Sequence, residues 1–143
     1  MQTQNHTEDR LANARSQAFA QLESIKEMVA ELLAAEESGD DEAREAAEQR
    51  IQEDALSVEV RGGWYSPGGD GDSGTPSEFK ILLCTGGPAV RIIGGLNDYS
   101  EPSTLCEIRL EFQDWFTPWT PATLGIEDRE ALVAYARCFY FGE

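Results

Sequence analysis

Three arginines, Arg61, Arg91 and Arg109, are the residues of this sequence best suited to hold a ligand. Each lies in a run of alternating apolar and polar residues, a pattern that predicts a β-strand. Neighbours in a strand point to opposite faces of a sheet, and the apolar neighbours are expected to face helices. All three guanidinium groups are therefore expected on the other face, where their paired donors match phosphates and carboxylates. The pattern indicates a platform for a small anionic ligand.

Aromatic residues near the ends of these strands would complete such a platform. The candidates are Trp64, Tyr65 and Tyr99. Their rings could stack on a base while the arginines hold phosphates. An alternative stays open, because Glu59, Glu107 and Glu111 fall on the same polar face. Pairs between these carboxylates and the arginines would make surface salt bridges and no ligand site.

Signals for catalysis and for a zinc site are weak. The single histidine, His6, lies in a segment expected to be frayed, so a nucleophile would lack a base. Cys84, Cys106 and Cys138 are odd in number and far apart, which fits neither a disulfide framework nor a zinc site. We therefore expect a protein that is not an enzyme and that has no catalytic residue, metal or cofactor.

Two glycine-rich segments resemble ligand loops. The segment 66–77 contains Asp70-x-Asp72, like the start of a calcium loop, but it lacks the later oxygen ligands and is predicted to be a mobile loop. Gly86 and Gly87 join two strands, whereas common phosphate loops run into a helix. A hairpin turn is the favoured interpretation there.

The fold expected from these patterns is α+β, with a four-stranded antiparallel sheet. The strands are predicted at residues 56–61, 79–84, 89–93 and 105–112. In the last strand, Cys106, Ile108, Leu110 and Phe112 alternate with polar residues, as in a strand with one buried face. The flanking segments are then expected to cover the apolar face.

Helices are predicted before and after the strands in the sequence. Residues 8–35 and Asp41–Asp54 form an N-terminal helical hairpin, with Gly39 at the end of the first helix and Asp40 as the cap of the second. Residues 126–141 form a C-terminal helix with an apolar stripe. Between sheet and last helix, the aromatic segment 115–119 is expected either to plug the edge of the core or to anchor an interface.

The first helix carries a heptad pattern. Its apolar members include Leu11, Leu22, Ile25, Val29 and Leu32. This stripe could pack within the chain, as any amphipathic helix must bury its apolar face. It could also pair with another copy, which predicts a homo-oligomer.

The chain divides into an acidic hairpin at residues 1–55 and a sheet with its helix at residues 56–143, expected to form a single compact unit. Its formal net charge is −16, from 27 acidic and 11 basic residues. Such a charge disfavours nucleic acid as a ligand and favours basic partners, although it could simply keep the chain soluble. The N-terminus lacks an apolar leader and no run reaches membrane-spanning length, so a cytoplasmic protein without a membrane partner is expected.

The run ILLCTGGPAVRIIGGLNDYSEPSTLCEIRLEFQDWFTPWT resembles small proteins encoded by phages, prophages and mobile elements of proteobacteria. Such proteins often antagonise host defence, as acidic anti-CRISPR or DNA-mimic inhibitors or as sponges for signalling nucleotides. The outline is similar to the first Thoeris anti-defence family, whose members hold a cyclic ADP-ribose isomer. The residues that match this resemblance are Arg61, Arg109, Asn97 and the pair Leu83-Cys84.

Three functions follow as expectations. The first is a non-enzymatic anti-defence protein in the host cytoplasm that sequesters a nucleotide-type immune signal on the arginine face. The second is an acidic inhibitor that occupies a basic groove of a host defence complex. The third is a structural phage protein that assembles through the heptads.

Overall fold

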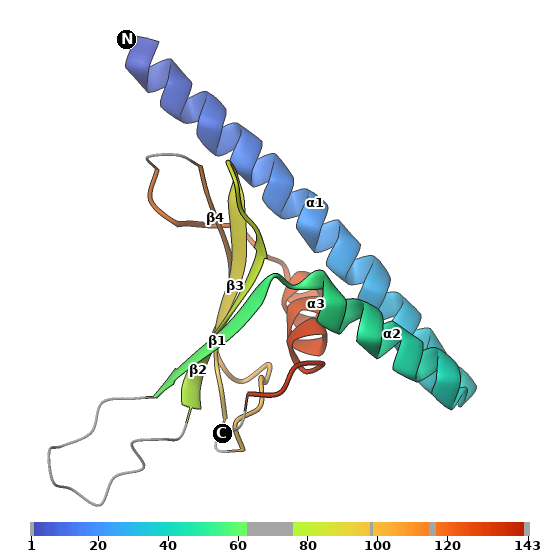
Figure 1. Ribbon diagram of the computed structural model, residues 1–143. Coiled ribbons are helices and arrows are strands. Elements are labelled where there is room, and N and C mark those ends of the chain that lie inside the picture. Colours follow the sequence, from blue (N-terminus) through green and yellow to red (C-terminus); the bar gives the residue numbers. More distant parts are fainter. Residues whose placement is uncertain (1, 63–75, 98, 115–116, 142–143) are drawn as a thin grey trace, which may run out of the picture.

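A long helix runs along one side of the molecule and supplies a large part of its core (Figure 1). The computed structural model describes residues 2–62, 76–97, 99–114 and 117–141, with the backbone alone for residues 2–10. Helix α1 (Gln2–Ser38) begins well before Glu8, so the prediction of a frayed start is wrong from Gln2 onward. No proline or glycine precedes Gly39, and a nucleated helix propagates through residues of this kind. Its buried residues are Ala14, Ala18, Leu22, Ile25, Met28, Val29, Leu32 and Ala35.

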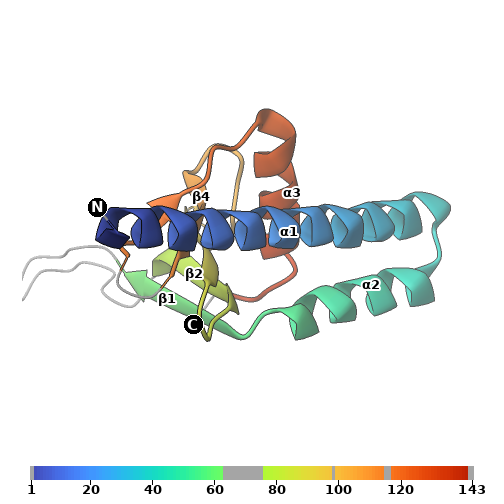
Figure 2. The same ribbon diagram turned by 90° about the horizontal axis from the view of Figure 1, so that it is seen from above.

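The helical hairpin forms as predicted. Gly39 ends α1 with a φ of 75°, a left-handed conformation that glycine adopts without strain. The carboxylate of Asp40 then accepts a hydrogen bond from the backbone N–H of Ala43 at 3.2 Å. This cap starts α2 (Asp41–Asp54), which returns alongside α1 (Figure 2). Local capping chemistry thus fixes the turn between the two helices.

Within the described residues, the sheet is antiparallel and has five strands in the order β1-β2-β3-β4-β5, one more than predicted. They are β1 (Ser57–Gly62), β2 (Pro76–Cys84), β3 (Ala89–Gly95), β4 (Ile108–Gln113) and β5 (Thr120–Pro121). The additional strand, β5, directly follows the aromatic segment 115–119 and pairs with β4. A strand this short shows no alternation in the sequence, which is why it was not predicted.

Strand boundaries differ from the expected ones at several points. Pro76 and Ser77 belong to β2, and the rest of the expected loop, 66–75, including Asp70 and Asp72, lies outside the described residues. β4 starts at Ile108, not at residue 105, because the N–H of Cys106 closes a turn on the carbonyl of Ser103 at 3.0 Å. The predicted apolar face is confirmed for Ile108, Leu110 and Phe112, which are buried, whereas Cys106 lies in the turn and the polar Glu111 is buried as well. The turn at Gly86 and Gly87 joins β2 and β3 as a hairpin, with positive φ at both glycines.

The helices cover only part of the sheet. α1 packs on β3 and β4, and α3 (Ile126–Ala136) packs on α1 and β4. Val58 and Val60 of β1 point to the helical side, since their cross-strand partners are the buried Ile81 and Phe79. They are nevertheless 37% and 46% exposed. The expectation that they face the helical side is therefore confirmed, and they stay partly exposed because α1 and α3 pack on β3 and β4, in the other half of the sheet.

Polar contacts and a ring contact attach the C-terminal segment to the rest of the fold. The hydroxyl of Tyr135, a buried residue of α3, donates to Asp54 at the end of α2 over 2.8 Å. Lys26 of α1 forms an ion pair with Asp128 of α3. The helix ends at Ala136 and not near residue 141, and Phe141 then packs on Phe79 with ring centroids 4.9 Å apart. Helices and sheet consequently share one hydrophobic core.

Candidate functional site

The three strand arginines lie on one face of the sheet, the face opposite α1. Arg61 stands across from Glu78, Leu82 across from Arg91, and Ile93 across from Arg109. Directly paired residues of an antiparallel sheet project to the same side. The two-residue periodicity of the strands is therefore sufficient to bring the arginines together.

These arginines line a groove of about 390 Å³ on the open face of the sheet. Its lining consists of Glu59, Val60, Arg61, Glu78, Phe79, Lys80, Arg91, Ile93 and Arg109. Four of these residues are basic and two are acidic, in a protein with a net charge of −16. The volume lies within the range of small-molecule sites, roughly 300–1,000 Å³. The groove therefore combines a suitable size with four basic side chains.

The basic residues come from four successive strands, one from each. Arg61 lies on β1, Lys80 on β2, Arg91 on β3 and Arg109 on β4. Sequence reasoning singled out the arginines but missed Lys80. Its signal was the same alternation, because Lys80 stands between Phe79 and Ile81, which face the core.

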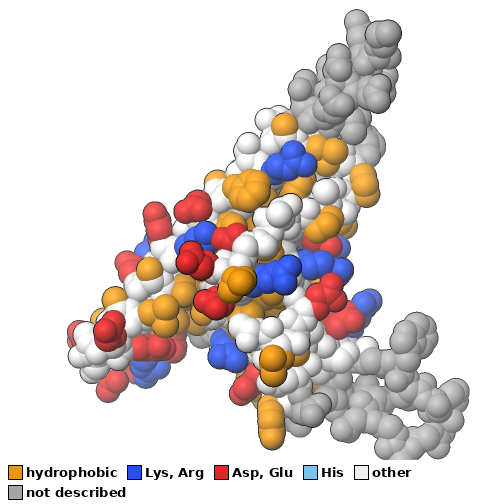
Figure 3. Space-filling model, turned by 180° about the vertical axis from the view of Figure 1, so that it is seen from behind, with side chains coloured by type: hydrophobic (Ala, Val, Ile, Leu, Met, Phe, Trp, Pro, Cys, Tyr) orange, Lys and Arg blue, Asp and Glu red, His pale blue; other side chains and the backbone are white. Residues whose placement is uncertain are grey.

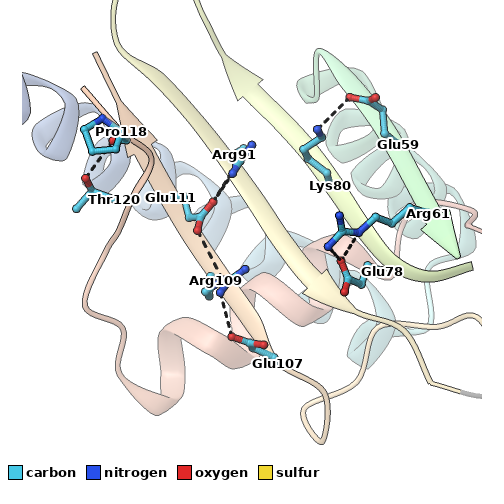
Figure 4. A network of polar contacts seen from close by, with 10 residues as sticks. All are labelled: Glu59, Arg61, Glu78, Lys80, Arg91, Glu107, Arg109, Glu111, Pro118 and Thr120. Atoms are coloured by element: carbon cyan, nitrogen blue, oxygen red, sulfur yellow. Dashed lines mark hydrogen bonds and ion pairs between the residues drawn. The ribbon is translucent and has the colours of Figure 1, made fainter. Parts of the chain in front are cut away.

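Each arginine also has a carboxylate neighbour, so the salt-bridge alternative is realised in this structure (Figure 4). Nε and Nη2 of Arg61 both lie 2.6 Å from Oε2 of Glu78. Nη1 of Arg109 lies 3.3 Å from Oε1 of Glu107. The side chains of Arg61 and Arg109 are 77% and 44% exposed. Exposed pairs contribute only about 0–1 kcal/mol, so an incoming anion can displace these carboxylates at small cost.

Arg91 is held differently from the other two arginines. Its Nε and Nη2 lie 2.9 and 2.8 Å from Oε1 of Glu111, whose side chain is 10% exposed. Its guanidinium carbon also lies 3.9 Å from the ring centroid of Trp119, in cation–π contact. Glu111 reaches Arg109 as well, with Oε2 3.6 Å from Nε. Arg91 and Glu111 thus form a fixed ion pair, and the indole ring that stacks on Arg91 comes from the aromatic segment 115–119.

Two other expected ligand residues, Asn97 and Tyr99, do not line the groove. Asn97 closes a local turn, its Oδ1 accepting from the N–H groups of Tyr99 and Glu101 at 2.9 and 3.1 Å. Tyr99 is 83% exposed and lies in the same turn. The structure therefore gives these two residues a place outside the groove. Trp64 and Tyr65 lie outside the described residues.

Cys84 lies on the side of the sheet that faces α1. Burial raises the pKa of its thiol, which lies within reach of Gln17 and Gln21 of α1. The thiol also contacts the carbonyl oxygen of Pro88 at 3.8 Å. A protonated, partly buried thiol on this side cannot contact a ligand held on the open face.

The heptad residues are already packed within the chain. Leu22, Ile25, Val29 and Leu32 are buried in the shared core, and Leu11 packs partly against it. The heptad pattern is thus accounted for by one copy. Self-association through this stripe stays a prediction that a single chain does not test.

The described residues also bear on metal binding and on membrane insertion. In the described part of the chain, no group of three histidine, cysteine, aspartate or glutamate residues could hold a metal ion. Within the same residues, none of the helices has the length and apolar character needed to cross a bilayer. Comparisons with protein-family models, curated proteins and solved structures find no match to this chain.

Proposed function

We propose that this protein is a non-enzymatic binding protein that holds a small phosphate-bearing ligand of the nucleotide class in the groove. One observation carries the proposal: four adjacent strands each contribute one basic side chain to the same groove. A nucleotide presents several phosphate oxygens at fixed spacing, and guanidinium groups donate to such oxygens in pairs. Four basic side chains in one groove are distinctive in a chain with a net charge of −16.

The geometry supports a division of labour among the arginines. Arg61 and Arg109 are exposed and weakly paired, so they can turn from their carboxylates toward a phosphate. Arg91 stays fixed by Glu111 and Trp119 and provides a rigid, charge-paired donor in the groove. Binding then exchanges ion pairs and buries no unpaired charge.

The biological setting we propose is a host cell in which the ligand is an immune signal. The resemblance to phage and mobile-element proteins supports this setting, and cyclic nucleotides and ADP-ribose isomers are the ligand classes it suggests. Sequestration needs only tight binding, which agrees with a groove lined by four basic side chains.

Thermal unfolding and calorimetry with a ligand panel test this function. The panel comprises cyclic dinucleotides, cyclic trinucleotides and ADP-ribose isomers, with inorganic phosphate as the reference anion. A ligand at one hundred times its dissociation constant stabilises the fold by about 2.7 kcal/mol. We expect Arg109→Ala and Arg61→Ala each to weaken binding by roughly tenfold, a loss of about 1.4 kcal/mol.

Arg44→Ala is the matched control, because Arg44 pairs with Glu48 on α2, outside the groove. It should leave the affinity unchanged. A panel without any stabilising member, or equal losses in Arg44→Ala and Arg109→Ala, would contradict the proposal.

A second candidate function, an acidic inhibitor of a basic host protein, is favoured by the tip of the helical hairpin. The tip carries the exposed acids Glu36, Glu37, Asp40, Asp41, Glu42 and Glu45. Figure 1 shows this turn as the end of the helical pair farthest from the sheet. Like charges at this density attract a basic surface and make association depend on salt. Replacing these acids by their amides should weaken salt-dependent binding to a basic nuclease, whereas Arg109→Ala should not affect it.

A further inference from the structure

Among the residues that the structure describes, strand β1 forms one edge of the sheet, with β2 as its strand neighbour. All six of its residues are exposed. The helices that cover β3 and β4 do not extend over it, so Val58 and Val60 remain 37% and 46% exposed. An edge strand presents backbone N–H and C=O groups that can pair with another strand. β1 is therefore a surface on which a further strand can add to the sheet.

The sequence of β1 is complementary to itself when two copies run antiparallel. With Val60 placed opposite Val60 of a second copy, Glu59 falls opposite Arg61 of that copy, and Arg61 opposite its Glu59. Residues directly opposite each other share a face, so both pairs lie on the open face. The two-fold axis passes between the two valines, and residues 58–62 of both copies are paired.

Other registers are less favourable. Moving the centre to Glu59 places Glu59 opposite itself, and moving it to Arg61 places two arginines together. Like charges in directly opposed positions destabilise a sheet. A shift that pairs residues of odd and even number would set charged residues on the apolar side. A centre at Val58 avoids like charges but pairs only residues 57–59 of the strand.

Charged residues of β2, the strand next to β1, extend this charge complementarity. Lys80 lies 3.7 Å from Glu59 in the neighbouring strand, and Glu78 lies 2.6 Å from Arg61. Across the interface, the side chains in one row perpendicular to the strands are Lys80 and Glu59 of one copy, followed by Arg61 and Glu78 of the second copy. Positive and negative charges alternate along this row of four side chains. On the helical side, the half-exposed Val60 residues of the two copies lie next to each other, and each lies beside the buried Phe79 of its own copy.

From this complementarity we propose that β1 is a homodimer interface, formed by antiparallel pairing with β1 of a second copy. The two five-stranded sheets become one continuous sheet with a two-fold axis at Val60. Glu59, Val60 and Arg61 also line the groove, so the grooves of the two copies meet at the axis. This interface is distinct from the heptad stripe of α1, which is buried within each chain.

Sedimentation of the full chain at about 0.15 M salt tests the dimer, since a Debye length of roughly 8 Å screens repulsion between two acidic molecules. Glu59→Arg places arginine opposite Arg61 in both pairs, and Arg61→Glu places glutamate opposite Glu59. Each should shift the protein to monomer, weakening association at least tenfold. The combined variant Glu59→Arg/Arg61→Glu restores opposite signs and should restore the dimer.

The matched control is the reversal Arg44→Glu/Glu48→Arg on α2, where an exposed pair is likewise exchanged away from the edge. It should leave the mass unchanged, and circular dichroism should show that all four variants fold. A wild-type chain that is monomeric at all concentrations overturns the proposal. So does a dimer that Glu59→Arg leaves intact, a combined variant that stays monomeric, or an assembly larger than a dimer, because a two-fold edge pair closes on itself.

Discussion

At the scale of single residues, Glu111 is the side chain on which the groove depends most. It is 7% exposed and reaches both Arg91 and Arg109. Glu111→Gln removes the negative charge beside a guanidinium group that is only 18% exposed. Leaving a partly buried charge without its counter-ion is costly, and we expect a loss of about 2 kcal/mol in the free energy of unfolding.

Urea unfolding measures this loss, and Glu107→Gln is the matched control. Glu107 pairs with the same Arg109, but its side chain is 72% exposed. Its replacement should change the free energy of unfolding by less than about 0.5 kcal/mol. Equal effects of the two substitutions would show that Glu111 does not anchor the arginines.

Gly94 is a second residue whose substitution should clearly lower the stability of the fold. A Cβ atom there would lie 2.7 Å from two ring carbons of Phe79, its cross-strand partner, and 3.0 Å from the carbonyl of Glu107. Such distances force the ring to move, so Gly94→Ala should cost about 1–3 kcal/mol. Gly95→Ala is the neighbouring control, since its closest contact is 3.4 Å from Cys106. Thermal unfolding that ranks the two variants equally would show that the Phe79 ring adapts freely.

At the scale of elements, the joint between α1 and α3 gives a stability that depends on pH. Asp128 is the third residue of α3, and its Oδ2 accepts a hydrogen bond from the N–H of Gly125 at 2.9 Å. The ammonium group of Lys26 and this N–H hold the pKa of Asp128 below its ordinary value of 3.8. A carboxylate with a lowered pKa stabilises the fold above that ordinary value, and the contribution disappears as pH falls through the pKa of the folded state.

Asp128→Ala should therefore cost about 1 kcal/mol at neutral pH, from the lost cap alone. The difference from the wild type should shrink as pH falls below 3.8, because the wild type then loses the same interaction. Urea titrations at neutral pH and at about pH 3 measure both values. The exposed Glu130, in the same helix, provides the control Glu130→Ala. A difference that persists unchanged in acid would remove the ion pair from the explanation.

The helices and strands also show which features of the fold could be predicted from the sequence. The limits of α2 and its cap follow from Gly39 and Asp40, because capping is a local interaction. The shared face of the arginines follows from the period of a strand, which is equally local. By contrast, the pairing of β5 and the stacking of Trp119 on Arg91 depend on how the chain returns to β4. No local pattern marks contacts of that kind.

At the scale of the whole molecule, the position of the helices decides which surfaces are available. They cover β3 and β4 and leave β1 exposed, an arrangement that the alternation of Val58 and Val60 does not reveal. Basic and acidic side chains are interspersed on the side of the molecule seen in Figure 3. Recognition by this protein therefore depends on local arrangements of charge, as both the groove and the β1 edge require.

The heptad stripe of α1 provides a test of the whole architecture. Leu22 is 2% exposed within the shared core, whereas Leu33 on the same helix is 53% exposed. Leu22→Ala should lower the free energy of unfolding by about 2–5 kcal/mol, because it leaves a cavity among helices and sheet. Leu33→Ala should change it by less than about 0.5 kcal/mol.

Sedimentation of the same two variants separates the heptad stripe from the β1 edge. If the stripe serves only the core of each chain, folded Leu22→Ala protein keeps the mass of the wild type, and Glu59→Arg alone shifts it. If the stripe joined two copies, Leu22→Ala would lower the mass and its stability would rise with protein concentration, as in coupled folding and association. Unfolding curves at several protein concentrations therefore distinguish a helix used inside one molecule from a helix shared between two.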